Sequence, residues 1–206
     1  MGEDDNDRLR EYYDENAGIY DRWMDSYDRF MLGDGRARLC ALASGRTLEL
    51  AVGTGLNLPL YGDDVDVVGL DYSPKMLEVA SARAARLGRA VELVVGDAHQ
   101  LEFGDGEFDT VLTTLFLSSV PDDRAAAAEA FRVLKPGGRF LVIDHVRSNV
   151  APVRWLEQIT APLVKRKTGV DLRRDPMDYL PGIGFRIDRA QRAKLGVIET
   201  VVATKP

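Results

Sequence analysis

The chain has 206 residues, of which 45% are hydrophobic and 29% charged, and its formal net charge is −6. This length suits one domain with one hydrophobic core, and no apolar run approaches the roughly 20 residues of a membrane helix. The single cysteine, Cys40, excludes an internal disulfide, and no metal site is expected. The acidic, polar N-terminus is neither a secretory signal nor a transit peptide, which favours the cytoplasm.

Charge is distributed unevenly along the chain. Residues 147–174 carry a net charge of +5, and the remaining residues together carry −11. An acidic body argues against general nucleic-acid binding, so no nucleic-acid partner is expected. The basic stretch is interpreted as a substrate-side or surface feature.

The first predicted element is a helix over residues 8–31. Ile19, Trp23, Tyr27 and Phe30 recur there at helical spacing, with charged residues between them. From residue 46 onward, short apolar runs alternate with longer helical stretches. Strands are expected at 47–51, 65–70, 91–95, 108–115 and 138–144, a short segment near 56–60, and helices near 74–87 and 122–134.

Two local signals mark the boundaries of these helices. Ser73 and Pro74 form a good helix start, because serine caps and proline suits the first turn. Residues 135–138, Lys-Pro-Gly-Gly, form a good helix stop and turn. After residue 145 the sequence predicts a helix near 152–165, a proline-containing segment, and a hairpin formed by 185–193 and 196–204.

Strands that alternate with helices pair in parallel through right-handed crossovers. The predicted fold is therefore α/β, with a doubly wound, mostly parallel sheet of seven strands. An N-terminal helical segment precedes this sheet, and an antiparallel C-terminal hairpin completes it.

A glycine-containing motif, ELAVGTG, occupies residues 49–55 at the end of the first predicted strand. Ligands bind at this end of the strands in open α/β sheets. Gly53 and Gly55 lack side chains, so the backbone can approach a ligand closely. The third glycine of a dinucleotide fingerprint is replaced by Leu58. A tight turn without a ligand is the alternative interpretation.

Acidic residues end the next two predicted strands. Asp71 follows Gly55 by 16 residues, near the spacing expected of an acid that binds ribose hydroxyls. Its alternative role is a helix cap, although Ser73 already supplies one. Asp97 ends the third strand, where a carboxylate can accept a hydrogen bond from the adenine amine; an Asx turn is the alternative.

These strand ends together resemble the class I methyltransferases that depend on S-adenosylmethionine (SAM). TLELAVGTG resembles the first motif of that family, GLDYSPKML its acidic second motif and VVGDAHQLEF its adenine motif. FDTVLTTLFLSSVPD and EAFRVLKPGGRFLVID resemble its fourth and fifth strands. YYDENAGIYD resembles the tyrosine-rich lid of the subgroup that includes ubiquinone and menaquinone methyltransferases.

The resemblance implies a Rossmann-like fold and a binding site for SAM, with S-adenosylhomocysteine as product. The residues implied around the methionine moiety are Glu49, Gly53, Thr54, Gly55 and Asn57. Asp71 is implied in ribose binding, and the residues implied around the adenine are Tyr72, Met76, Asp97, Ala98 and His99.

Four further residues are implied on the other sides of the cofactor. Thr114 and Leu115 are expected to face the sulfonium, and Tyr12 and Tyr20 are expected to close over the cofactor. A simple packing stripe is the alternative for the tyrosines. One domain over 1–206 follows, with a helical lid at 1–45, a SAM-binding core at 46–145, and a substrate-side segment with the hairpin at 146–206.

The substrate side is predicted with less detail. DHVRS and PVRWLEQITAPL look closest to a subgroup with bacterial phosphatidylethanolamine N-methyltransferases and thiol methyltransferases. However, Val170 and Asp171 stand where that subgroup often has cysteine and histidine. The acidic N-terminal helix is also unlike the basic helix expected at an anionic membrane. These features favour a small-molecule acceptor and weak or no membrane association, with phospholipid N-methylation as the alternative.

Catalysis needs few groups, because the sulfonium is an activated methyl donor. His145 is the candidate base, with a role at the strand end or in substrate contact as the alternative. Arg147 is expected to hold an anionic group or to be solvated, and Trp155 and Ile159 to cap the substrate pocket. A catalytically silent SAM-binding accessory protein is the rival reading. An NAD-dependent oxidoreductase is disfavoured by the missing glycine and by the absence of a Tyr-x-x-x-Lys pair.

Overall fold

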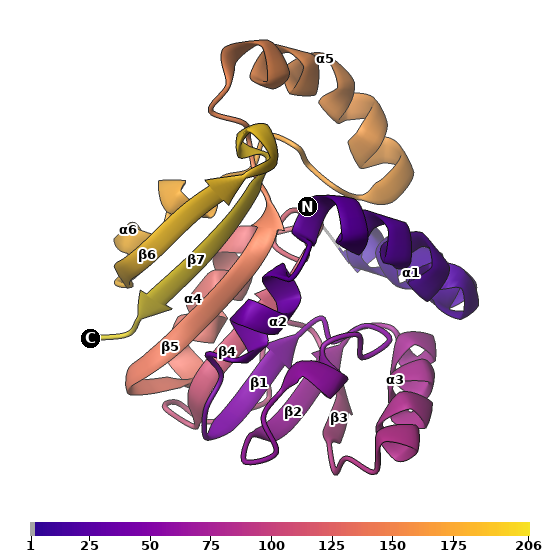
Figure 1. Ribbon diagram of the computed structural model, residues 1–206, viewed down its shortest axis with the longest axis vertical. Helices are drawn as coiled ribbons and strands as arrows, with labels where there is room; N and C mark the ends of the chain where they lie inside the picture. The colour runs from indigo at the N-terminus through magenta and orange to yellow at the C-terminus, as the bar shows by residue number, and fades with distance from the viewer. Residues whose placement is uncertain (1–2) are drawn as a thin grey trace.

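The computed structural model describes residues 3–206, apart from the side chains of residues 3–6 and 167. Its strands form a single seven-stranded sheet in the order β3-β2-β1-β4-β5-β7-β6 (Figure 1). The strands are β1 (Arg46–Leu50), β2 (Asp66–Asp71), β3 (Glu92–Val95), β4 (Phe108–Thr114), β5 (Leu134–His145), β6 (Arg186–Ala193) and β7 (Ile198–Thr204).

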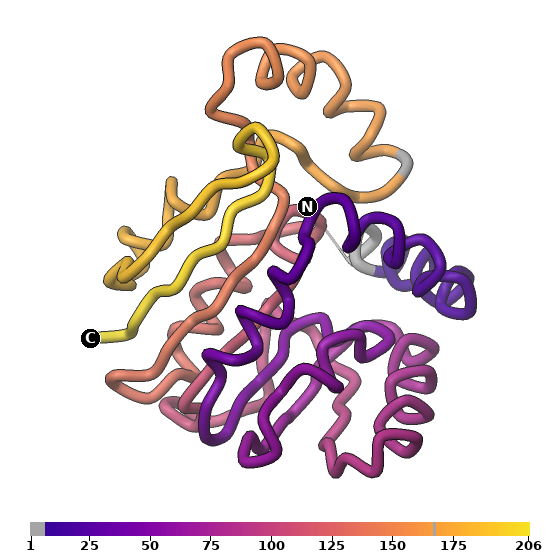
Figure 2. The backbone as a smooth tube through the Cα atoms, viewed as in Figure 1, coloured from indigo at the N-terminus to yellow at the C-terminus, as the bar shows by residue number. Residues whose placement is uncertain are grey.

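Strands β1 to β5 pair in parallel, so their carboxyl ends meet at one edge of the sheet. Strand β7 is antiparallel to both of its neighbours and lies between β5 and β6. The backbone trace in Figure 2 follows this final hairpin back along β5. The predicted mostly parallel, seven-stranded sheet with an antiparallel hairpin is confirmed.

The helices are α1 (Glu3–Tyr27), α2 (Gly35–Cys40), α3 (Pro74–Leu87), α4 (Asp123–Val133), α5 (Ala151–Thr168) and α6 (Leu180–Ile183). A π-helical turn at Asp28–Leu32 extends α1, and short 3-10 turns occur at Leu58–Leu60, Pro176–Asp178 and Lys194–Gly196. Within the described residues no helix is long and apolar enough to cross a membrane.

Two apolar layers hold the helices on opposite faces of the sheet. One layer packs α4 and α6 on the sheet and includes Phe108, Phe140 and Phe185. The other packs α2 and α3 on it and includes Leu39, Leu112 and Leu141. Because both faces of the sheet are covered, β1 and β4 are buried along almost their whole length, including polar residues such as Thr47, Glu49 and Thr113.

Helix α3 shows how local sequence fixes an element beside the carboxyl ends. The Ser73 hydroxyl accepts a hydrogen bond from the Met76 amide at 3.1 Å, and Pro74 opens the helix, as the sequence predicts. Gly88 ends the helix in a left-handed conformation. The structure differs at β5, which begins four residues earlier than predicted because residues 134–137 pair irregularly before Gly138.

Candidate functional site

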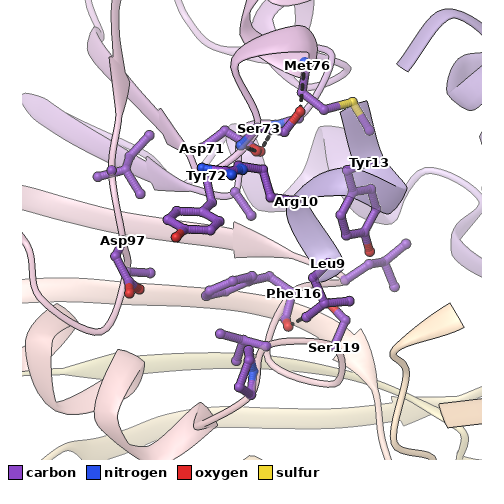
Figure 3. A pocket seen from close by; sticks show the side chains of 18 of the residues that line it. Leu9, Arg10, Tyr13, Asp71, Tyr72, Ser73, Met76, Asp97, Phe116 and Ser119 are labelled. Atoms are coloured by element: carbon purple, nitrogen blue, oxygen red, sulfur yellow. Dashed lines mark hydrogen bonds between the residues drawn. The ribbon is translucent and has the colours of Figure 1, made fainter. Parts of the chain in front are cut away.

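A cavity of about 110 Å³ lies at the carboxyl ends of β1 to β4, beneath α1 (Figure 3). Ten of the residues predicted at the site line it: Tyr20, Gly53, Asp71, Tyr72, Met76, Asp97, Ala98, His99, Thr114 and Leu115. Further lining residues include Leu9, Arg10, Tyr13, Ser73, Phe116, Ser119, Val120 and Pro121. The strand ends therefore converge on one cavity, although its sequence segments are far apart.

Asp71 links two walls of the cavity. Its Oδ2 accepts a hydrogen bond from the Gly53 amide at 2.8 Å, and its Oδ1 accepts one from the Ser73 amide at 2.9 Å. Each carboxylate oxygen keeps a further lone pair. Burial raises the pKa of Asp71 to about 6, although these backbone hydrogen bonds lower it. The carboxylate is thus positioned to accept hydrogen bonds from a ligand's hydroxyl groups.

The two positions of the first motif require glycine for different structural reasons. Gly53 has a φ of +56°, and the space around it is open to the cavity side. Gly55 has a φ of +78°, and a Cβ there would meet the Leu58 side chain at 2.7 Å. Gly53 therefore permits a close approach of a ligand to the backbone, whereas Gly55 is required by packing and lies outside the cavity lining.

Asp97 and His99 form a fixed pair at the opposite end of the cavity. The Asp97 Oδ1 lies 2.6 Å from His99 Nδ1 and accepts the His99 amide at 2.8 Å. The Asp122 amide donates to His99 Nε2 at 3.2 Å. Because Nε2 accepts, the proton lies on Nδ1 and points to Asp97. Both nitrogens of His99 are engaged, so its role here is to orient the Asp97 carboxylate.

Behind the cavity, Glu49 is buried in a polar network. The side chains of Asn57 and Tyr61 each donate to a Glu49 carboxylate oxygen at 2.7 Å. Burial raises the pKa of Glu49 to about 7 despite these hydrogen bonds and the nearby Arg36. The Arg36 guanidinium donates to Asn57 Oδ1 at 3.2 Å and to Thr114 Oγ1 at 2.7 Å. Thr114 lines the cavity, so this network supports one of its walls.

Four aspartates at seven-residue spacing attach α1 to the rest of the site. Asp14 accepts from the Ser73 hydroxyl at 2.5 Å and from the Lys75 amide at 3.2 Å. Asp21 accepts from the Thr54 hydroxyl at 2.6 Å and pairs with Arg83. The remaining contacts join Asp7 to the Tyr72 hydroxyl at 3.5 Å and Asp28 to the Arg36 guanidinium at 2.8 Å. Spacing of seven places these acids on one helix face, which faces the core.

The central part of this chain matches a family model described as a methyltransferase domain, over residues 48–142. A demethylmenaquinone methyltransferase of Clavibacter sepedonicus is 34% identical over 166 residues, which cover 72% of this chain and 67% of that protein. The chain belongs to the methyltransferase-domain family.

Two further relatives extend this comparison. A phosphatidylethanolamine N-methyltransferase of Cereibacter sphaeroides is 38% identical over 119 residues, which cover 57% of this chain and 59% of that protein. The chain thus spans about three fifths of that relative's length. A Thermotoga maritima structure described as a SAM-dependent methyltransferase, possible histamine N-methyltransferase, shares the fold with a TM-score of 0.71 and 24% identity, covering 94% of this chain and 98% of that one.

The aromatic residues of α1 in this methyltransferase-domain protein differ in their positions. Tyr20 lines the cavity, as does Tyr13, whose hydroxyl hydrogen-bonds with Ser119. Tyr12 is outside the lining and packs edge to face against Tyr13 with ring centroids 5.4 Å apart. The guanidinium carbon of Arg10 lies 5.7 Å from the centre of the Tyr72 ring (Figure 3). Arg10 and Tyr13 are not predicted by the sequence motifs, although both lie near Leu9 on the helix face that covers the cavity.

Other predicted residues support the cavity from outside. Glu49, Thr54, Gly55 and Asn57 are not part of its lining. Glu49 and Asn57 belong to the network behind Thr114, and Thr54 binds Asp21 of α1. Direct cofactor contacts for these four residues stay a prediction.

His145 lies at the end of β5, outside the cavity lining. Burial lowers the pKa of His145 to about 4, so its imidazole is neutral at physiological pH. Its Nδ1 is buried and has no hydrogen-bond partner among the described residues. The neighbouring Asp144 is also buried, and its oxygens accept from the amides of Ser118 and His145. A catalytic role for His145 stays a prediction.

The three predicted substrate-side residues also lie outside the cavity lining. Arg147 pairs with Asp178 at 3.3 Å. Trp155 and Ile159 lie on α5, and 65% and 56% of their surfaces are exposed. The structure does not bring these side chains together with the cofactor-side residues, because α5 turns its large apolar side chains outward.

The contacts of Asp21 predict how firmly α1 covers the cavity. Asp21→Ala removes the hydrogen bond with Thr54 and leaves Arg83 without its carboxylate partner. We expect the exchange of α1 amide hydrogens to accelerate by about 10-fold or more, since a charged hydrogen bond is worth about 1.5–3 kcal/mol. Hydrogen exchange followed by mass spectrometry measures this rate.

Asp25→Ala is the matched control, because Asp25 is exposed and its ion pair among the described residues is with Arg29, one turn away in sequence. Equal exchange of α1 in both variants would contradict the proposed anchoring by Asp21.

Proposed function

We propose that this protein transfers the methyl group of SAM to a nucleophile on a small-molecule acceptor and releases S-adenosylhomocysteine. The observation that carries the proposal is the position of Asp71, whose carboxylate faces the cavity between the Gly53 turn and Asp97. Membership of the methyltransferase-domain family supports the same reaction.

The chemistry of the cavity fits this cofactor. Asp71 has lone pairs left for a ribose diol, and Gly53 leaves room for a close approach of a ligand. The aromatic ring of Tyr72 and the thioether of Met76 offer an apolar surface for adenine. Asp97, oriented by His99, offers an acceptor for the adenine amine. When bound, SAM supplies a methyl group that its sulfonium has already activated.

The residues of the chain then have three tasks. Tyr13 and Tyr20 of α1, with Phe116, exclude water from the cavity. Thr114, held by Arg36 and Asn57, orients the wall at the ends of β1 and β4. His145 remains the candidate base for an acceptor that arrives protonated, and this role requires its pKa to rise from about 4 when substrate binds. Proximity and the exclusion of water supply most of the acceleration in this scheme.

The alternatives predict different behaviour in solution. The relative named phosphatidylethanolamine N-methyltransferase supports a phospholipid acceptor, but it is matched over about three fifths of its length. A silent accessory protein would bind SAM without turnover. We also propose that the protein acts in the cytoplasm, which agrees with its composition.

Calorimetry should show binding of SAM and S-adenosylhomocysteine at micromolar concentrations, without binding of NAD. A screen with methyl-labelled SAM against amines, phenols, thiols and dispersed phospholipids then identifies the acceptor. Tight binding of NAD without SAM would refute the proposal. Binding of SAM without turnover on any acceptor of the panel would favour the accessory protein.

A further inference from the structure

Helix α5 presents its large apolar side chains to solvent. Trp155, Leu156, Ile159 and Leu163 are all more than half exposed. The spacing of 155, 159 and 163 places three of them along one face of the helix, and Leu156 lies beside them. Isolated exposed apolar residues are ordinary, but four on adjacent helical turns form a continuous patch.

The opposite face of α5 holds the helix on the protein. Ala161 is fully buried, and Glu157 is 6% exposed and accepts a hydrogen bond from the Ser148 amide at 2.8 Å. The helix is therefore amphipathic, but its bulky apolar face points away from the core. A helix that used this face for folding would bury it.

The exposed charges on α5 are positive. Arg154, Lys165 and Arg166 are exposed, and the single acid within residues 151–168 is the buried Glu157. Lys165 also pairs with Asp171 at 3.3 Å. Apolar side chains flanked by basic residues are the composition of helices that lie in the headgroup region of a membrane.

The hairpin tip between β6 and β7 adds to this surface. Lys194 and Leu195 both have a positive φ, and Leu195 is 69% exposed. The Ser148 hydroxyl donates to the Leu195 carbonyl at 2.6 Å, which fixes the tip beside the start of α5 (Figure 1). Successive positive φ angles are those that a tight hairpin turn requires, and this turn holds Leu195 at the tip in solvent.

The C-terminal end of α5 lies next to the lining of the cavity. Gly169, which ends α5, lies close to the Leu9 side chain, and Leu9 lines the cavity. The Asp171 amide donates a hydrogen bond to the Ser118 carbonyl at 2.7 Å. This bond joins the segment that follows α5 to the segment that holds the cavity residue Ser119. A surface that covered α5 would therefore also lie close to the entrance of the site.

We propose that α5 and the Lys194–Leu195 tip form a docking surface for an anionic lipid bilayer. The acyl region of the bilayer can bury the side chains of Trp155 and Ile159. Anionic headgroups attract the basic residues that flank them. This inference goes beyond the proposed methyl transfer and holds for any acceptor.

The proposal differs from the weak membrane association expected from sequence. That expectation placed Trp155 and Ile159 in a pocket and counted the acidic charge of the whole chain. In the structure Asp14 and Asp21 of α1, and Asp28 of the π-helical turn that follows it, are engaged with partners on the core. Charge further away is screened over about 8 Å at physiological salt, so the charge of α5 itself dominates at contact.

Co-sedimentation with vesicles tests the proposal. One set is pure phosphatidylcholine, and the other contains equal parts of phosphatidylcholine and phosphatidylglycerol. We expect the protein to sediment with the anionic vesicles and to be released as salt is raised. In a Trp23→Phe background, Trp155 is the sole tryptophan, and its emission should shift to the blue on binding.

The double variant Ile159→Glu with Leu163→Glu should bind anionic vesicles at least about 10-fold more weakly, because it removes two apolar anchors and adds negative charge. Leu87→Glu is the control, since Leu87 is 46% exposed at the end of α3. Calorimetry with S-adenosylhomocysteine should give the same affinity for both variants and the wild type. That readout separates a failed docking surface from a failed cofactor assignment.

Three results would overturn the proposal. The wild type would remain in the supernatant with both vesicle types, or the double variant would sediment like the wild type. The third contradicting result would be a dimer of the wild type, seen by light scattering without vesicles, that the double variant does not form. The surface would then be an interface between two copies of the chain.

Discussion

The Asp71→Asn variant is expected to bind S-adenosylhomocysteine about 30- to 100-fold more weakly than the wild type. The wild-type carboxylate has lone pairs for two ligand hydroxyls, and the amide replaces one acceptor oxygen with a donor. A hydrogen bond to a charged group is worth about 1.5–3 kcal/mol, or about 10- to 150-fold in affinity, and the expected loss lies within this range. Titration calorimetry measures it.

The Asp71 prediction has a control on the same strand. Asp66 is exposed at the start of β2, so Asp66→Asn should leave the affinity unchanged. Circular dichroism must show that Asp71→Asn folds, since its amide oxygen retains only one of the two backbone hydrogen bonds with Gly53 and Ser73. A folded variant with wild-type affinity would refute ribose binding by Asp71.

The free energy of unfolding is expected to depend on the protonation of Glu49. Burial raises the pKa of Glu49 from 4.5 to about 7 in the folded protein. Below pH 4.5 both the folded and unfolded states hold the proton. Between pH 4.5 and about 7 the Glu49 carboxyl group keeps its proton in the folded state and loses it in the unfolded state. The contribution of Glu49 to the free energy of unfolding therefore falls by about 3 kcal/mol as the pH rises to 7. Above pH 7 the loss is complete.

Glu49→Gln should abolish this pH dependence. Its amide still accepts from Asn57, and the Tyr61 hydroxyl can reverse its hydrogen bond to accept from the new amide group. We therefore expect the variant to be more stable than the wild type at pH 8 by up to about 3 kcal/mol, with a difference near zero at pH 4. Urea unfolding across this range gives both curves.

Glu92→Gln provides the comparison, because Glu92 is exposed on β3. Parallel stability curves for the wild type and Glu49→Gln would show that Glu49 does not hold its proton in the folded protein. A Glu49→Gln variant that is more stable than the wild type at pH 8 would mean that the buried carboxyl group of Glu49 lowers the stability of the wild type.

The strand ends of the candidate site could be predicted because their signals are local. The Ser73-Pro74 cap and the change from apolar run to acid at Asp71 each lie within a few residues. Parallel pairing then brings Asp71 and Asp97 to the same edge of the sheet. The part of the cavity lining at the strand ends follows from this rule without knowledge of any distant contact.

The orientation of α1 could not be predicted in the same way. Of the four residues whose helical spacing predicts the helix, Ile19, Trp23 and Phe30 are exposed, whereas Tyr27 packs against the core. The face on the core instead carries the aspartates at seven-residue spacing. Their partners, such as Thr54 and Arg83, are distant in sequence. Polar attachment of this kind overrides the usual assignment of charged residues to solvent.

The orientation of α5 could not be predicted for a related reason. Its apolar spacing favours a cap over a pocket, which stays a prediction, whereas the structure buries Glu157 and Ala161 and leaves Trp155 exposed. Periodicity identifies an apolar face, but it does not identify what covers that face. The contact of Glu157 with the Ser148 amide and the burial of Ala161, which the apolar spacing does not reveal, fix the rotation of the helix.

The place of β7 in the sheet has a consequence for the order of synthesis. Strand β5 emerges from the ribosome more than fifty residues before β7, and β7 separates it from β6. Until residue 204 is available, one side of β5 presents unpaired amides and carbonyls over apolar residues such as Leu141. Such an edge is a template for aggregation. A nascent chain stalled within β7 would therefore need a chaperone more than one stalled earlier, before β5 has formed.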